Sequence, residues 1–175
     1  MADRQDEIRG FFASCWHFRD KIVWSWDFLA AVIVFAAAGF LPSDADLARL
    51  SAPLAAAALA LGAALVGVVV AGLAVVVALL DDQLLALMDA DTKSGGVPGH
   101  MFPYWFVTGT GVAAFLLALL LLLAESALGP AANRVLFAAV ASLLVWTAIG
   151  VFNLVASLQA LGINRALFVR LRPGA

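Results

Sequence analysis

The sequence predicts an all-α integral membrane protein that crosses the bilayer four times. Hydrophobic residues make up 65% of the 175 residues, against roughly 45–50% in an ordinary soluble domain. Charged residues make up only 13%. A water-soluble fold of this length could not bury so much apolar surface and still present a polar exterior. The composition therefore excludes a cytosolic enzyme domain, and the net charge of −2 gives no basic surface for direct binding of nucleic acid.

Four apolar runs are long enough to be transmembrane helices. The first has twenty residues, or ~30 Å as a helix, which matches the hydrocarbon core of a bilayer. The second would be ~42 Å long, so it has to tilt or to project beyond one surface. In chain order we expect a cytoplasmic, interfacial amphipathic helix within 1–21, a first span over 22–41, an outer loop over 42–52, a second span over 53–80, a cytoplasmic loop over 81–103, a third span over 104–124, an outer loop over 125–134, a fourth span over 135–162 and a cytoplasmic tail over 163–175.

Basic residues are distributed unequally between the two sides of this topology. An even number of spans places both termini and the 81–103 loop on one side. That side carries Arg4, Arg9, Arg19, Lys21, Lys93, Arg165, Arg170 and Arg172, and the other side carries Arg49 and Arg134. Because short loops rich in Arg and Lys stay in the cytoplasm, we expect both termini to be cytoplasmic. The eight Arg against two Lys and the predominance of Ala and Leu among the apolar residues are typical of GC-rich bacterial coding, which indicates a bacterial inner membrane.

Two cytoplasmic segments are candidates for a surface that binds a protein partner. Large aromatic residues lie on one face of the N-terminal amphipathic helix, and the 81–103 loop is acidic. The residues concerned are Phe11, Phe12 and Trp16 in the helix, and Asp81, Asp82, Asp89 and Asp91 in the loop. The alternatives are a plain interfacial anchor and a solvated polar face. We expect the chain to lose helical structure from Thr92 to Pro103, where Ser94-Gly95-Gly96 and two prolines interrupt it.

No group of residues predicts catalysis. The pair Asp81-Asp82 lacks the second acidic cluster with which membrane transferases hold a divalent cation against pyrophosphate. The hydroxyl residues of the spans have no base to activate them as nucleophiles. Asp27 is the one acid inside a predicted span, where we expect it to reach water or Lys21, and a single such residue gives little support to an ion-coupled carrier. We therefore expect no enzyme activity, no cofactor and no bound metal.

The second span carries small residues at alternating steps of three and four. They are Ala57, Ala60, Ala64, Gly67, Ala71, Ala74 and Ala78. Small residues on one stripe let another helix approach closely, which is the main way in which helices associate in lipid. We interpret this small-residue stripe as a contact between helices of an oligomer. The alternative is chance, because thirteen of the twenty-eight residues from 53 to 80 are Ala or Gly.

The fourth span carries a stripe of mostly polar residues on one face. Its members are Ser142, Trp146, Gly150, Asn153, Ser157 and Asn164. An Asn inside a span is disfavoured against lipid, so this face should meet protein or water. One interpretation is hydrogen bonding between helices inside a bundle or oligomer. The other is the lining of a pore, formed when several copies present this polar stripe to a shared axis.

Two functional hypotheses follow from these patterns. In the first, the chain is a non-enzymatic, homo-oligomeric membrane anchor or sensor that recruits or regulates a cytosolic protein. In the second, it is a pore-forming channel subunit gated by its cytoplasmic segments. In its architecture, with four spans and short outer loops, the chain resembles the small, span-only membrane subunits found beside cytosolic proteins in bacterial stress and phage-defence modules. That resemblance implies the first function.

Overall fold

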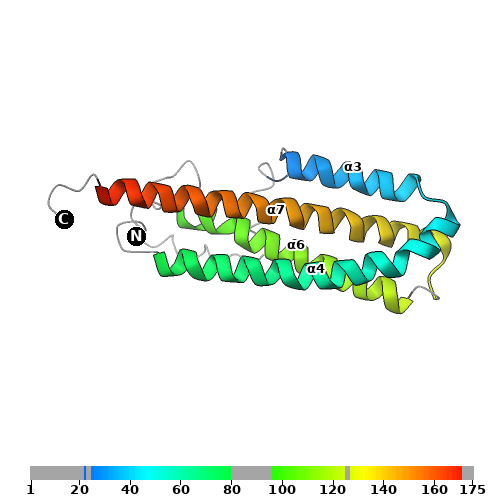
Figure 1. The fold of residues 1–175 in the computed structure, drawn as a ribbon. Coiled ribbons are helices and arrows are strands. Elements are labelled where there is room, and N and C mark those ends of the chain that lie inside the picture. Colours follow the sequence, from blue (N-terminus) through cyan, green and yellow to red (C-terminus); the bar gives the residue numbers. More distant parts are fainter. Residues whose placement is uncertain (1–21, 23–24, 80–95, 125–126, 171–175) are drawn as a thin grey trace, which may run out of the picture.

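The described part of the chain is a bundle of four α-helices (Figure 1). In this computed structural model the described residues are 22, 25–79, 96–124 and 127–170. The helices are α3 (Trp26–Phe40), α4 (Asp44–Leu79), α6 (Gly96–Ala124) and α7 (Pro130–Arg170). No strand occurs among these residues, so the predicted all-helical fold is confirmed for the part of the chain that the structure describes.

Three of the four helices are long and apolar enough to cross a membrane. The qualifying segments are Asp44–Ala78, Met101–Leu123 and Pro130–Ala160. Helix α3 has only 15 residues, or ~22 Å, which is less than the ~30 Å of a hydrocarbon core. By length and composition these three helices are candidate membrane spans, which supports a helical membrane protein, and the first span stays a prediction. The predicted N-terminal amphipathic helix lies outside the described residues.

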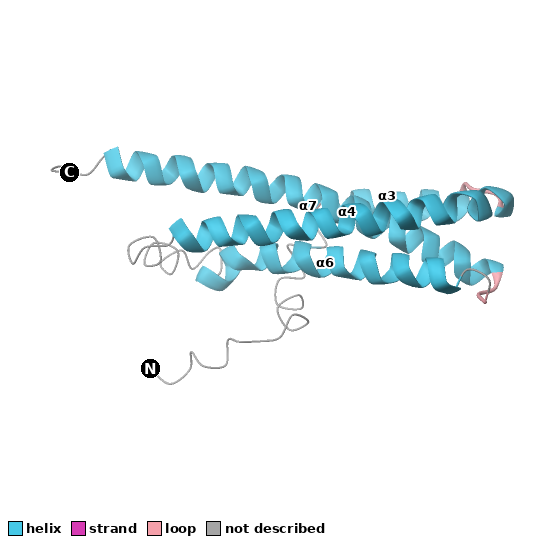
Figure 2. Cartoon of the chain, turned by 60° about the horizontal axis from the view of Figure 1, so that its bottom comes forward, coloured by secondary structure: helices cyan, strands magenta, loops and turns pink. Residues whose placement is uncertain are grey.

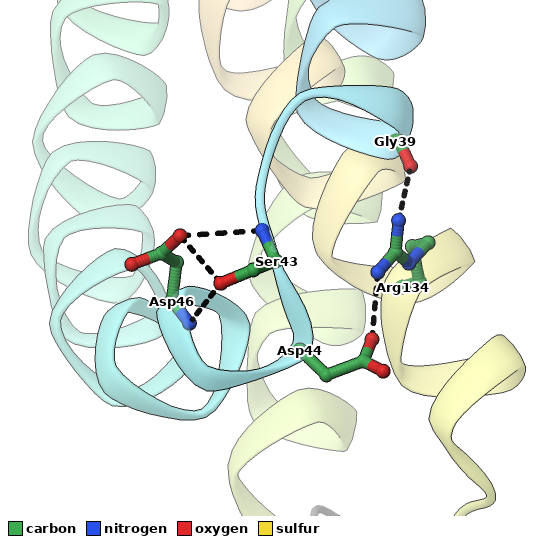
Figure 3. A network of polar contacts seen from close by, with 5 residues as sticks. All are labelled: Gly39, Ser43, Asp44, Asp46 and Arg134. Carbon is green, nitrogen blue, oxygen red and sulfur yellow. Dashed lines mark hydrogen bonds and ion pairs between the residues drawn. The ribbon is translucent and has the colours of Figure 1, made fainter.

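Helices α4, α6 and α7 are longer than the predicted spans, because hydropathy does not register the residues that begin a helix outside the apolar run. Ser43 and Asp46 form a capping box: the Ser43 hydroxyl accepts from the Asp46 N–H (3.2 Å), while the Asp46 carboxylate accepts from the Ser43 N–H (3.2 Å) and hydroxyl (2.6 Å) (Figure 3). Helix α4 therefore begins at Asp44, and most of the predicted outer loop over 42–52 is helical. Pro130 occupies the first position of α7, which proline favours, so this helix begins inside the predicted 125–134 loop.

Helix α6 extends into the segment that we expected to be irregular. It begins at Gly96, whereas the predicted break ran to Pro103. Pro98 falls in the first turn, where a backbone N–H has no partner inside the helix. Pro103 deprives a single carbonyl of its donor, and helices of membrane proteins tolerate such a loss. At the other end of the chain, α7 runs on to Arg170, through part of the predicted tail.

Helix α7 is the centre of the bundle. It packs against each of the other three described helices, whereas α3 packs against α7 alone. The connection 41–43 and the described part, 127–129, of the connection between α6 and α7 lie at the same end of the molecule, which we call the loop end (Figure 1). The other end, where α7 projects furthest, is called the groove end. A second view shows the same near-parallel arrangement of long helices (Figure 2).

The buried core has two parts. The loop-end core contains Leu47, Ala55, Ala58, Ala118, Leu121, Leu136, Phe137 and Val140, and the groove-end core contains Val69, Val76, Tyr104, Val107 and Leu154. Small residues let the helices approach closely. A Cβ added at Gly150 of α7 would lie 2.6 Å from Cγ2 of Val107, so this position accepts no side chain without a shift of α6.

Candidate functional site

The polar stripe of α7 faces α3 and α6 of the same chain. The buried Ser142 hydroxyl donates a hydrogen bond of 2.8 Å to the carbonyl of Ala31 in α3. Three residues beyond Gly150, less than one turn, the stripe contacts the same helix again. The Asn153 Nδ2 donates a hydrogen bond of 2.6 Å to Oδ2 of Asp27. The stripe thus supplies two side-chain hydrogen bonds between α7 and α3, the helix that packs against α7 alone.

Aromatic rings continue this contact from α3 across to α6. Trp146 meets Phe28 of α3 with ring centroids 5.5 Å apart and an interplanar angle of 64°. On its other side it meets Phe106 of α6 at 5.2 Å and 65°. Phe106 in turn lies 5.7 Å from Phe102. Edge-to-face packing of this kind stabilises aromatic pairs beyond the area that they bury, so Trp146 holds the three helices in register.

A groove opens between α3, α6 and α7 beside these rings. Its volume is about 330 Å³. Helix α3 contributes Asp27, with Ser25 just ahead of its first turn. The other helices contribute Gly99, Phe102, Pro103, Phe106, Val107 and Thr110 from α6, and Trp146, Gly150, Asn153, Leu154 and Ser157 from α7. Among these described residues Asp27 is the one with a charged side chain. We refer to this feature as the α3–α6–α7 groove.

Asp27 has a partner that the sequence did not suggest. We expected its carboxylate to reach water or Lys21, and the structure places it against Asn153, 126 residues further along the chain. A usable signal was present, because an acid and an amide inside predicted spans each need a polar partner. What periodicity could not show was that α3 and α7 run side by side. Thr110 and Thr147 were missed for the same reason, and their buried hydroxyls lie 3.3 Å apart between α6 and α7.

The small-residue stripe of α4 lies on the outside of the bundle. All of its members are exposed: Ala57, Ala60, Ala64, Gly67, Ala71, Ala74 and Ala78. A Cβ added at Gly67 would meet nothing within 4 Å. The opposite face of α4 packs against α6 and α7, and its buried members are Ser51, Ala55, Ala58, Gly62, Val69 and Val76. The structure therefore leaves the small-residue stripe available for a contact outside the chain.

The other predicted site residues fall outside what the structure describes. Phe11, Phe12, Trp16, Asp81, Asp82, Asp89 and Asp91 belong to segments that are not described, and the same holds for the side chain of Asn164. Among the described residues no three His, Cys, Asp or Glu side chains are grouped so that they could hold a metal ion.

The fold defines the class of this protein, an all-helical bundle in which three of the four described helices are long and apolar enough to cross a membrane. Comparison of the chain with protein-family models, with curated proteins and with solved structures finds no match.

Proposed function

We propose that the chain is a non-enzymatic, homo-oligomeric anchor or sensor in a bacterial inner membrane, where it recruits or regulates a cytosolic protein. The observation that carries this proposal is the engagement of the polar stripe within one chain. Ser142 and Asn153 donate to α3, and Trp146 is held between rings of α3 and α6. A pore would need this whole face turned toward a shared axis. Here Ser142, Trp146 and Gly150 lie against neighbouring helices of the same chain, while Asn153 and Ser157 stay exposed.

Self-association through α4 is supported by the likeness of its two faces. The buried face uses small residues at steps of three and four, and a Cβ added at Gly62 would lie 3.7 Å from the Gly111 carbonyl oxygen. The exposed small-residue stripe repeats that spacing on the opposite side. Helices in lipid associate where small residues allow close backbone approach. A second copy of α4 is therefore the partner that this face fits best, and two such faces meeting form a symmetric dimer contact.

A cytosolic partner is supported by where the longer segments attach. The two connections at the loop end, 41–43 and 125–129, have three and five residues, too few for a receptor surface. The segment 80–95 connects α4 to α6 at the groove end, and residues 1–21 precede α3, whose first turn is directed toward the same end (Figure 1). The unequal distribution of Arg and Lys assigns that end to the cytoplasm. A role beside cytosolic proteins of a stress or phage-defence module fits this arrangement.

The oligomer is tested by native mass spectrometry of the full chain purified in detergent. We expect the wild type to form a defined oligomer and Gly67→Leu to lower the copy number, because leucine at Gly67 holds the two helices apart. Ala156→Leu is the matched control, because it enlarges an exposed alanine on α7 instead. An unchanged copy number in Gly67→Leu would remove the support for self-association through α4.

The distinction between anchor and pore is tested by planar-bilayer recording of the purified oligomer. We expect background conductance for the wild type, alone and with a co-purified cytosolic partner. Channels in the wild type that disappear in an intact Asn153→Leu oligomer would establish the pore instead, because leucine there would make a constriction that excludes water.

Orientation is tested by labelling introduced cysteines after Cys15 is replaced by Ser. A cysteine at Ser94 should be shielded in intact cells, whereas one at Gly129, which is exposed at the loop end, should react from outside. The reverse pattern would move the partner to the other compartment.

A further inference from the structure

The α3–α6–α7 groove has the chemistry of a site for an organic cation. We propose that it binds a small ammonium group, primary or methylated, with Asp27 as its counter-ion and the rings of Phe102, Phe106 and Trp146 as its apolar wall. The groove volume of about 330 Å³ lies at the lower end of the range for small-molecule sites, which suits a head group of a few heavy atoms. This inference goes beyond the proposed function and holds whether or not a protein partner is recruited.

The negative charge in the groove is not cancelled by the described residues around it. Asp27 Oδ2 accepts from Asn153, whose amide is uncharged, at 2.6 Å. No Lys or Arg stands among the described lining residues. The contrast is Asp44 at the loop end, whose carboxylate pairs with Arg134 at 2.6 Å. A carboxylate next to a low-dielectric wall attracts a cation more strongly than one in water does, so Asp27 is suited to a ligand with positive charge.

The hydroxyl groups of the groove are oriented as acceptors. Thr110 donates its hydrogen to the Val107 carbonyl at 3.0 Å, and Ser157 donates to the Leu154 carbonyl at 2.8 Å. Ser25 donates to the Ile22 carbonyl at 2.7 Å. Because each hydroxyl carries a single hydrogen, what it can still offer a ligand is a lone pair. The groove therefore favours a ligand that donates hydrogen bonds. An anion would face the lone pairs of these hydroxyl oxygens and would be repelled by them.

The aromatic wall adds a second attraction for the same kind of ligand. Trp146 and Phe106 pack edge to face, with centroids 5.2 Å apart, and both line the groove with Phe102. Aromatic faces attract ammonium groups through their quadrupoles, and Trp does so most strongly. An anionic or neutral polar ligand gains nothing from such a wall. The carboxylate, the acceptor hydroxyls and the rings thus select one chemical class.

Two sources can supply this ammonium group: the head group of a phospholipid and a free compound from the aqueous phase. Both share the chemistry that the groove recognises. The experiment below separates them.

The test is isothermal titration of choline into the full-length wild type in maltoside micelles, which contain no ammonium groups. We expect saturable binding of one choline per chain. The uncharged isostere 3,3-dimethylbutan-1-ol has the same shape and should neither bind nor compete. Asp27→Asn keeps an oxygen acceptor for Asn153 and should weaken choline binding about tenfold or more. Asp44→Asn removes a carboxylate at the opposite end of the bundle, outside the groove, and should bind choline as the wild type does.

To separate the sources, the titration is repeated with added phosphatidylcholine or phosphatidylglycerol. Competition by the first lipid alone assigns the site to a lipid head group, and competition by neither assigns it to a free ammonium compound. The proposal is overturned if choline fails to bind the wild type, if the isostere binds equally well, or if a folded Asp27→Asn binds as the wild type does. The isostere comparison uses the wild type alone, so it decides the question even if Asp27→Asn does not fold.

Discussion

The two ends of the bundle hold α3 against α7 with different chemistry. At the loop end Arg134 of α7 donates to the Gly39 carbonyl at 3.3 Å and pairs with Asp44 at 2.6 Å (Figure 3). At the groove end Asn153 of α7 meets the Asp27 carboxylate. The first contact balances a positive and a negative charge, and it lies beside the capping box of α4. The second leaves a negative charge without an opposite one among the described neighbours.

This difference indicates that the loop-end contact only holds helices together, whereas the groove-end contact can also bind a ligand. A charge pair beside a short connection fixes where two helices turn, and nothing further is required of it. An acid whose described partner is a neutral amide, next to a groove and a wall of rings, has the capacity to hold a ligand. At the loop end the α3–α7 contact therefore lies beside a neutralised charge pair, and at the groove end it has a carboxylate that can bind a ligand.

The largest expected difference between the ends comes from enlarging a glycine at each. Gly150→Ala should lower the free energy of unfolding by about 1–3 kcal/mol, the usual effect of overpacking. The new Cβ would lie 2.6 Å from Val107, which is β-branched and stiff. Gly39→Ala at the loop end should have little effect, because its Cβ would lie 3.7 Å from Ala138. Denaturant titration in mixed micelles, followed by circular dichroism, checks both. Equal stability of the two variants would show that α6 shifts freely at the groove end.

A smaller effect is expected from removing the amide that fixes Asp27. Asn153→Leu should lower the free energy of unfolding by roughly 0.6–2 kcal/mol, as measured for hydrogen bonds between membrane helices. Hydrogen exchange should become faster in the first turn of α3 and stay unchanged near Gly39, because Arg134 still holds that end. Phe152→Leu, at an exposed neighbouring position, is the control and should change neither measurement. Uniformly faster exchange along α3 would mean that the two ends are not held independently.

The smallest effect is expected at the loop end itself. Arg134→Ala removes a charge pair whose side chains are 32% and 75% exposed, so we expect a loss of about 0.5–1 kcal/mol at low salt. Salt should screen this contribution, so the wild type and the variant should become nearly equal in stability at about 1 M salt. The control is Arg49→Ala, an exposed position on α4. A loss in Arg134→Ala that does not diminish with salt would assign the stabilisation to the uncharged bond with Gly39.

Composition and hydropathy were sufficient to predict the helical membrane class, because an apolar run of this length needs a helix to satisfy its backbone in lipid. They were insufficient for the ends of the helices. The Ser43–Asp46 capping box begins α4 well ahead of the apolar run at Pro53. The three-residue spacing of Ser43 and Asp46 was visible in the sequence. Hydropathy averaged over a window does not detect it, because a capping box involves only two residues.

Periodicity predicted which residues share a face and left open what covers that face. On α4, Ala60 and Ala64 follow the same spacing as Ala58 and Gly62, yet the first pair is exposed and the second is buried. Both faces are small and apolar, so the pattern alone could not choose between them. On α7 the stripe was recognised, and its partner Asp27 was noted separately. Their pairing depends on a contact between distant segments, which local spacing does not contain.

The short α3 and the long α4 give the molecule two apolar belts of unequal height. Helix α3 measures ~22 Å over its 15 residues, whereas the apolar run of α4 from Pro53 to Leu79 measures ~40 Å. If α3 crosses the bilayer, the lipid beside it has to thin, whereas α4 has to tilt or the lipid beside it has to thicken, at a cost of fractions of a kcal/mol per ångström of mismatch. Copies joined through their α4 helices would bury the longer apolar surfaces of α4 between them and leave the shorter α3 helices in contact with lipid at the outside of the assembly. Such an assembly would be sensitive to bilayer thickness and would collect where the membrane is thin.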